Sequence, residues 1–429
     1  MGNKCCLHLK QGYEEQKDSH TEDQGGSEDY SLKSVIESSD TTYSNQFQNR
    51  VNDSEKYSFE EETKSSAFTE SDRKLWAKQR STDPGDEEFF STSINLIDFN
   101  IISLVGKGSF SKVYLVQKKD NGRYYAMKEL KKVSLINERK KKRVLTEKNI
   151  FLKFNNPFIV KMYYSFQTVD KIYFILDFVN GGELYSHMVK EVRFSELKAK
   201  FYAAEIVIAL KTLHEAGIIY RDLKPNNILL DSQGHIKLID FGLSKFLEPN
   251  IEPTTSIVGT PNYIAPEILQ KKKHTSMIDW WSFGVMVFEM ITGNLPFLDH
   301  TCHSHKDIYR NILTKKINFS RKFSREAKDF VVKLLHRDPS KRLGAKGTKE
   351  IMDHVFFSEV DWVKIAIKGY VAPFVPETNG ETDLANISQC YLDQKGLEES
   401  GDIRMTDAEK EDRYLEELSY NHSKASVDS

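Results

Sequence analysis

The chain reads Y-R-D-L-K-P-N-N at residues 220–227, D-F-G at 240–242 and A-P-E at 265–267. In this set, Asp222 can accept a proton from an attacking hydroxyl, and Lys224 can neutralise charge on a phosphoryl group during its transfer. Asn227 and Asp240 carry hard oxygen ligands of the kind that Mg²⁺ prefers. Any one of these residues could belong to a solvated turn. Their occurrence together in one fixed order predicts phosphoryl-transfer chemistry.

Length and composition narrow the class of protein. A chain of 429 residues exceeds one ordinary domain, which predicts a folded core of two lobes with tails. The net charge of -2 gives no overall positive field, so we expect no nucleic-acid partner. The four cysteines form neither a disulfide framework nor a paired metal spacing, which favours a cytoplasmic location. The sequence has no apolar run of about 18 residues, so we expect no membrane span.

Residues 1–98 differ in composition from the rest of the chain. They are rich in Ser, Thr, Asp, Glu, Asn and Gln, which predicts a mostly disordered extension. The start of this segment also suggests a lipid anchor and peripheral membrane contact, with myristate on Gly2 and palmitate on Cys5 or Cys6. However, position 6 is Cys rather than Ser or Thr, so the acylation pattern is only partly met. A terminus with incidental cysteines is an equal alternative.

The folded part begins with strand patterns at 99–105, 112–117 and 124–130, which predict an antiparallel sheet. Between the first two strands, residues 106–113 read G-K-G-S-F-S-K-V. Glycines let backbone amides approach phosphate oxygens, whereas a dinucleotide site would need a helix to follow. Taken alone, such a hairpin is more often just a turn, and the later motifs favour the phosphate-binding interpretation.

A helical pattern at 138–154 places Glu147 on the apolar face of the helix. An inward-facing carboxylate is costly to bury without a cation. Lys128, which shares a strand face with Ala126, can supply that cation. We therefore predict that Lys128 and Glu147 pair. The basic run at 139–143 resembles a nuclear-localisation patch, but the solvated face of this helix explains it better.

With these motifs, residues 99–357 resemble a eukaryotic protein kinase, and G-T-P-N-Y-I-A-P-E at 259–267 resembles the serine/threonine AGC group, in the RSK and Akt neighbourhood. The resemblance implies a bilobal α+β fold. We expect an antiparallel β-sheet N-lobe with one key helix at about 99–180 and a mainly α-helical C-lobe at about 181–357. Residues 358–429 are expected to form the AGC C-terminal regulatory tail, because P-F-V-P and Y-L-E-E-L-S-Y occupy the places of its motifs.

The resemblance also implies an active enzyme that uses ATP and Mg²⁺. Catalytic roles are expected for Asp222, Lys224, Lys128 and Glu147, and metal binding for Asn227 and Asp240. The nucleotide contacts are expected from Val105, Gly106, Lys107, Gly108, Ser109 and Phe110 at the glycine loop and from Lys128. Val113, Ala126 and Leu229 would sandwich the adenine. Asp177 and Val179 would lie on the hinge, the segment 176–180, and Glu183 would follow it.

Substrate specificity follows from the same resemblance. Glu183 is expected near the ribose and near a basic substrate residue three positions before the phosphoacceptor. Glu289 resembles another acidic contact for substrate arginine. Asn226 stands where Glu is usual, so one acidic determinant is missing. Thr260 resembles the residue that hydrogen-bonds the catalytic Asp in serine/threonine kinases. We also expect Glu267 to pair with Arg342, as a buried ion pair.

Regulation is expected at two serines. Ser256, in T-T-S-I-V-G-T, resembles the activation-loop site of an upstream kinase. A phosphate there would add a charge of about -1.5 to -2. The cations expected to receive it are Arg143, Arg221 and Lys245.

The second candidate phosphosite is Ser419, in the tail. Leu415 and Leu418 replace the aromatic pair that usually precedes this residue, which predicts weaker docking of the tail on the first lobe. The protein is expected to be monomeric. Ser111 stands where the third glycine of the loop is usual, so a catalytically weak scaffold remains the alternative to an active protein kinase. A small-molecule kinase is a more distant alternative.

Overall fold

The computed structural model describes residues 94–108, 111–135, 138–247, 258–393, 418 and 420–421. All of them belong to the compact unit Arg80–Ser429. Several predicted sites lie outside the described residues: the lipid anchor at Gly2, Cys5 and Cys6, the loop residues Ser109 and Phe110, and the phosphosites Ser256 and Ser419. These stay predictions.

Among the described residues, six strands form one antiparallel sheet. Their order is β1 (Phe99–Lys107), β2 (Ser111–Lys118), β3 (Tyr124–Lys131), β5 (Lys171–Asp177), β4 (Met162–Gln167) and β10 (Tyr420–Asn421). The register pairs Val113 with Lys128 and Leu115 with Ala126. Because side chains alternate along a strand, Val113, Ala126 and Lys128 share one face of the sheet. The three strands predicted from the sequence are confirmed.

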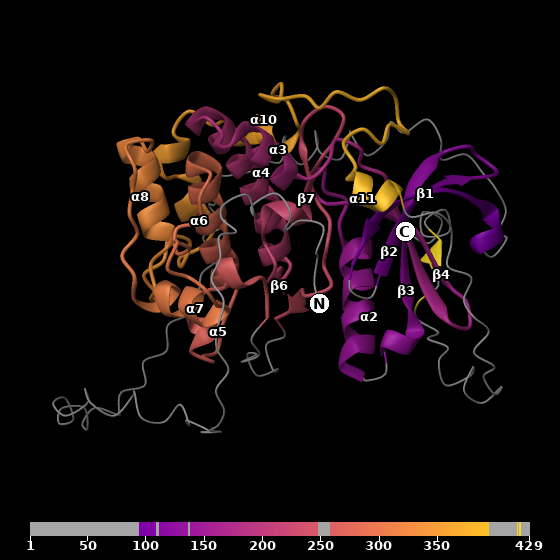
Figure 1. The fold of residues 1–429 in the computed structure, drawn as a ribbon, viewed down its shortest axis with the longest axis horizontal. Coiled ribbons are helices and arrows are strands. Elements are labelled where there is room, and N and C mark those ends of the chain that lie inside the picture. Colours follow the sequence, from indigo (N-terminus) through magenta and orange to yellow (C-terminus); the bar gives the residue numbers. More distant parts are fainter. Residues whose placement is uncertain are drawn as a thin grey trace, which may run out of the picture. The chain divides into compact units, whose positions relative to one another are not determined.

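The helix α2 (Glu138–Lys153) lies beside this sheet (Figure 1). Its inward face buries Val144, Glu147 and Phe151, as its apolar pattern predicted. Leu152, which the same pattern placed on this face, is exposed instead. Two single turns, η2 (Leu96–Asp98) and η3 (Lys132–Leu135), complete the first lobe. The helix α2 therefore presents a buried carboxylate, Glu147, toward the sheet.

The second lobe is mainly helical. Its helices are α3 (Leu184–Glu191), α4 (Glu196–Glu215), α5 (Pro266–Leu269), α6 (Met277–Thr292), α7 (His305–Thr314), α8 (Arg325–Leu334), α9 (Lys349–Met352) and α10 (Trp362–Ala366). Every residue of α6 is buried, which makes it the central helix of this core. Gly284 permits the close approach of α8, because a Cβ there would lie 2.8 Å from Leu334 Cβ. The predicted α+β architecture of two lobes is confirmed.

Two short two-stranded sheets flank the polar motifs of this lobe. One pairs β6 (Ile218–Ile219) with β9 (Lys245–Phe246), and the other pairs β7 (Ile228–Leu230) with β8 (Ile236–Leu238). The single turns η4 (Pro225–Asn227), η5 (Pro261–Tyr263) and η6 (Val355–Phe357) lie in the same lobe. The loop 220–227 therefore runs from β6 to β7, and the D-F-G residues follow β8.

The C-terminal tail contacts both lobes. In the second lobe, the Phe374 ring lies 4.8 Å from the His187 ring, and Lys198 Nζ lies 4.4 Å from the Phe374 ring centroid. Further along, α11 (Gln389–Leu392) lies against β1. The edge strand β4 pairs with β10, and Leu418, just before β10, is fully buried. Within the described ranges, every helix falls short of the length and apolarity that a membrane crossing requires.

Candidate active site

Lys128 on β3 contacts two carboxylates. Its Nζ lies 2.6 Å from Glu147 Oε1 on α2 and 3.4 Å from Asp240 Oδ1, which follows β8. Burial lowers the pKa of Lys128, but Asp240 and Glu147 outweigh burial, and the pKa is raised above its usual value. Lys128 in turn holds the pKa of Asp240 below its usual value, helped by the Gly242 N–H. The predicted pair of Lys128 and Glu147 is confirmed.

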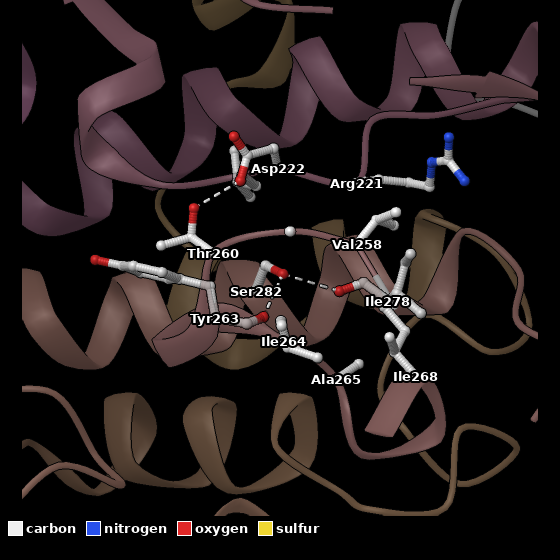
Figure 2. A pocket seen from close by; sticks show the side chains of 12 residues that line it. Arg221, Asp222, Val258, Thr260, Tyr263, Ile264, Ala265, Ile268, Ile278 and Ser282 are labelled. Carbon is white, nitrogen blue, oxygen red and sulfur yellow. Dashed lines mark hydrogen bonds between the residues drawn. The ribbon is translucent and has the colours of Figure 1, made fainter. Parts of the chain in front are cut away.

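A second cluster surrounds Asp222 in the loop 220–227. Lys224 Nζ donates to Asp222 Oδ2 at 2.7 Å and to Thr260 Oγ1 at 2.8 Å. Because the ammonium has no acceptor, the Thr260 hydroxyl must direct its own proton to Asp222 Oδ1, at 2.8 Å (Figure 2). Asn227 Nδ2 donates to Asp222 Oδ2 at 2.9 Å. The predicted contact of Thr260 with Asp222 is therefore present.

The backbone of this loop is held by Asp279 of α6, a residue that the sequence analysis missed. Asp279 is fully buried, and its carboxylate accepts hydrogen bonds from the N–H groups of Tyr220 and Arg221, at 2.9 and 2.8 Å. His214 contributes a third contact at 2.8 Å. Arg221 adopts a φ of +70°, which is strained for a residue with a side chain. Asp279 thus stabilises the strained turn that presents Asp222.

A small cavity lies next to this loop (Figure 2). Its volume of about 10 Å³ has room for about one water molecule. The Ser282 hydroxyl at its wall contacts the carbonyl oxygens of Tyr263 and Ile278, at 2.8 and 3.2 Å. These contacts fix the segment that carries Thr260, and the cavity itself is too small to hold a substrate.

The structure distributes the predicted nucleotide contacts over both lobes. Val105, Gly106 and Lys107 belong to β1, Gly108 follows it, Val113 belongs to β2, Ala126 and Lys128 to β3, Asp177 ends β5, Val179 and Glu183 follow β5, and Leu229 belongs to β7. Val113, Ala126 and Leu229 are all partly exposed. A bridge between Glu183 and Leu229 joins the segment after β5 to β7.

The Asp177 carboxylate, at the end of β5, is held by three donors. Tyr163 Oη donates to Asp177 Oδ1 at 2.8 Å, and the Lys161 N–H donates to Oδ2 at 3.0 Å. Lys237 Nζ lies 3.2 Å from the same oxygen. The sequence placed Asp177 in the hinge but gave no sign of these three partners. Because the Asp177 carboxylate is occupied by these donors, the backbone of Asp177 is the part that remains for a contact with a nucleotide.

At the tip of the first hairpin, the Gly108 N–H donates to the Ser111 carbonyl at 2.8 Å. A Cβ on Gly108 would lie 2.8 Å from Ser111 Oγ, which is too close for an ordinary contact. A side chain at position 108 would therefore require the Ser111 hydroxyl to rotate away.

Glu183 and Asn226 lie together on the second lobe. Asn226 Nδ2 donates to Glu183 Oε2 at 2.9 Å. Burial raises the pKa of Glu183 above its usual value, although this hydrogen bond and Lys224 oppose the shift. Asn226, which stands where an acidic residue was expected, thus orients the carboxylate of Glu183.

The predicted ion pair of Glu267 and Arg342 is confirmed. Arg342 binds both carboxylate oxygens of Glu267, at 2.7 and 2.9 Å. Arg342 also donates to the Met277 carbonyl at 2.6 Å. The two side chains are almost completely buried, so the pair fixes the end of A-P-E against the start of α6.

Two of the three cations expected to receive a phosphate on Ser256, Arg221 and Arg143, lie close enough to repel each other. Burial lowers the pKa of Arg221 to about 10, and repulsion from Arg143 on α2 adds to this effect. Because Arg143 repels the charge of Arg221, an anion such as a phosphate placed near both cations would be stabilised.

A family model described as the protein kinase domain matches residues 99–357, more than half of the chain. The RAC family serine/threonine-protein kinase homolog of Dictyostelium discoideum is 44% identical over 306 residues, which cover 71% of this chain and 68% of that protein. Serine/threonine-protein kinase YPK2/YKR2 of Saccharomyces cerevisiae is 42% identical over 71% of this chain and 45% of its own length. Serine/threonine-protein kinase Sgk1 of Fundulus heteroclitus is 43% identical over 69% of each chain. The matched region thus spans less than half of the yeast relative. The chain belongs to the protein kinase family, and its kinase domain is of the serine/threonine AGC type that its motifs predicted.

Proposed function

We propose that this chain transfers the γ-phosphate of ATP to serine or threonine hydroxyls of protein substrates that carry basic residues. Protein kinases use ATP and Mg²⁺. The observation that carries the proposal is the presence of two clusters. In one, Lys128 is bound to Glu147 and Asp240, and in the other, Asp222 is bound to Lys224 and Thr260. In both clusters the charged groups are held by hydrogen bonds from neighbouring side chains, which is the arrangement that a transferase needs.

In this mechanism, Asp222 accepts the proton of the attacking hydroxyl. Its carboxylate is fixed at both oxygens by Thr260 and Asn227, so its geometry needs little reorganisation. Lys224, which donates to Asp222, is placed to neutralise charge on the transferred group. Lys128 is held by Glu147 with its charge intact, and so offers a fixed cation for the nucleotide phosphates.

Asn227 and Asp240 suit Mg²⁺. The amide nitrogen of Asn227 is used in the hydrogen bond to Asp222, which leaves its oxygen as the metal-ligand atom. Asp240 is ionised at neutral pH because Lys128 lowers its pKa. Among the described residues, no cluster of three or more His, Cys, Asp or Glu forms a metal cage, and Mg²⁺ in such enzymes is held by one or two protein oxygens with substrate phosphates. When bound, the ion would screen the charge of the phosphates.

Substrate choice is assigned to Glu183, whose carboxylate is oriented by Asn226 beside the loop 220–227. One acid supports recognition of one basic residue before the phosphoacceptor. Phosphorylation of Ser256 by an upstream kinase is proposed as the activating step, since burial and repulsion from Arg143 lower the pKa of Arg221, one of the cations expected to receive the phosphate. If Ser256→Ala has the specific activity of wild type before and after phosphatase treatment, this regulation is absent.

Transfer of labelled γ-phosphate to an arginine-containing peptide tests the proposal. The wild type should phosphorylate the peptide on Ser or Thr, and Asp222→Asn should lose this activity. Equal background rates for both proteins would contradict the proposal and favour a scaffold role.

A further inference from the structure

The Asp177 carboxylate joins segments that lie on opposite sides of the hinge. Its Oδ1 accepts from Tyr163 Oη on β4 at 2.8 Å. Its Oδ2 accepts from the Lys161 N–H, just before β4, at 3.0 Å and from Lys237 Nζ on β8 at 3.2 Å. Two of these donors thus belong to the first lobe and one to the second. A single side chain at the end of β5 couples the lobes.

Lys237 is also joined to the second-lobe side of the proposed nucleotide site. The register of β7 and β8 pairs Lys237 with Leu229, the residue expected against the adenine. The next residue, Leu238, exchanges backbone hydrogen bonds with Phe158 and Val160, at 2.8 and 3.0 Å. The strand that carries Lys237 is therefore fixed to Leu229 on one edge and to the chain before β4 on the other.

The pair of Asp177 and Lys237 is charged. Burial raises the pKa of Asp177, but Lys237, followed by the Lys161 N–H and the Tyr163 hydroxyl, holds it below its usual value. The side chains of Lys237 and Asp177 are 17% and 20% exposed, so solvent screens their attraction only in part. Removal of Lys237 would leave the carboxylate with two neutral donors, both from the first lobe.

Asp177 borders a cavity, and the side chains of both partners are partly exposed rather than part of the core. A cavity of about 550 Å³ lies behind the hinge, and its wall includes Tyr163, Asp177 and Asn180 together with Thr378 and Gly380 of the tail. A change at Lys237 therefore removes a link between lobes without creating a void in the hydrophobic core. This separates the effect of the link from the effect of core packing.

We propose that Lys237 is a positioning residue for nucleotide binding. By holding the Asp177 carboxylate, it fixes the hinge backbone relative to Leu229 and so sets the width of the space between hinge and second lobe that the adenine enters. Lys237 does not touch the nucleotide and acts through Asp177. The inference rests on the proposed ATP site at Val113, Ala126 and Leu229.

The test compares Lys237→Met and Lys237→Arg in the full-length chain. The matched control is Lys368→Met, because Lys368 forms a lysine–aspartate pair of similar exposure, 19% and 20%, with Asp231 at 2.7 Å. Calorimetry with Mg²⁺ and a non-hydrolysable ATP analogue should show that Lys237→Met weakens binding about fivefold, the low end of ordinary coupling between sites. Lys237→Arg and Lys368→Met should keep the wild-type Kd.

A second readout separates positioning from chemistry. Single-turnover phosphoryl transfer at saturating ATP should have the wild-type rate in Lys237→Met, because the contacts that hold Asp222 come from Thr260, Lys224 and Asn227 and not from Lys237. Tyr163→Phe removes another hydrogen-bond donor to Asp177 and should also weaken nucleotide binding. This variant replaces Lys237→Met in the test if Lys237→Met does not fold.

Three results would overturn the inference: a wild-type Kd in Lys237→Met, an equal loss in Lys368→Met, or a loss confined to the single-turnover rate. A wild-type protein that binds no nucleotide would overturn the proposed function as well. Normal wild-type binding with an unaffected Lys237→Met would overturn the inference alone.

Discussion

The side-chain amide of Asn226 donates a hydrogen bond of 2.9 Å to the carboxylate of Glu183. A neutral donor orients the acid without adding a second negative charge. Replacement by Glu should add that charge and favour peptides with a second basic residue. Two unit charges about 4 Å apart in water attract by about 1 kcal/mol, so the preference should rise about fivefold.

The measurement is the ratio of kcat/KM for two peptides that differ in one arginine, with Asn226→Glu beside wild type. Asn226→Gln is the neutral control and should keep the wild-type ratio. An unchanged ratio in Asn226→Glu would show that this position does not face the substrate.

Recognition of a basic peptide should depend on pH through Glu183. Burial raises the pKa of this carboxyl, so on acidification it takes up its proton at a higher pH than an ordinary glutamate. Loss of the negative charge removes the attraction for arginine, and KM for the peptide should therefore rise as pH falls from neutral. Asp240 does not titrate in this range, because Lys128 holds its pKa below the usual value. Peptide KM measured across mildly acidic to neutral pH tests this.

In Glu183→Gln, which lacks the negative charge, the KM for the peptide should be high at every pH. A wild-type KM that is constant over this range would assign peptide recognition to another acid.

The contacts of Asp222 predict a large loss of kcat when Asp222 is replaced and a smaller loss when Thr260 is replaced. Asp222→Asn removes the proton acceptor and should lower kcat by about 10²–10⁴-fold. Thr260→Val removes one hydrogen bond to the carboxylate and should lower kcat less, while KM for ATP stays the same. Thr260→Ser retains the hydroxyl and should restore the rate in steady-state assays. Equal rates for Thr260→Val and wild type would mean that Lys224 and Asn227 suffice to hold Asp222.

Residues whose role depends on local pattern could be predicted from the sequence, and Glu147 is the example. An acid on the apolar face of a helix signals its need for a cation, and the strand pattern of Lys128 supplied one. Asp279 and Lys237 gave weaker signals, because their partners are backbone N–H groups and a hinge carboxylate that become neighbours when the chain folds. One acid at the start of the apolar segment Met277–Thr292 was the available clue to Asp279.

The stability of the second lobe should depend on Arg342 and Glu267. Both side chains are almost completely buried, so removal of one partner leaves an uncompensated charge. Arg342→Met should destabilise the fold by about 3–5 kcal/mol, measured by urea denaturation. The exposed pair of Lys349 and Asp353 is the control, and Lys349→Met should leave the midpoint unchanged. Equal midpoints for wild type and Arg342→Met would show that the pair is energetically neutral.

Docking of the tail on the first lobe should depend on Leu418. The sequence predicted weaker docking because leucine replaces an aromatic residue, yet Leu418 is fully buried and its carbonyl accepts a hydrogen bond from Ser165. Leu418→Ala should cost about 2–5 kcal/mol of packing, which a two-residue pairing of β10 with β4 cannot replace. Hydrogen exchange at the edge of β4 should therefore become faster. Leu197→Ala, at a site that is 72% exposed, should leave this exchange unchanged. Unaltered protection of β4 in Leu418→Ala would show that the backbone pairing alone holds the tail.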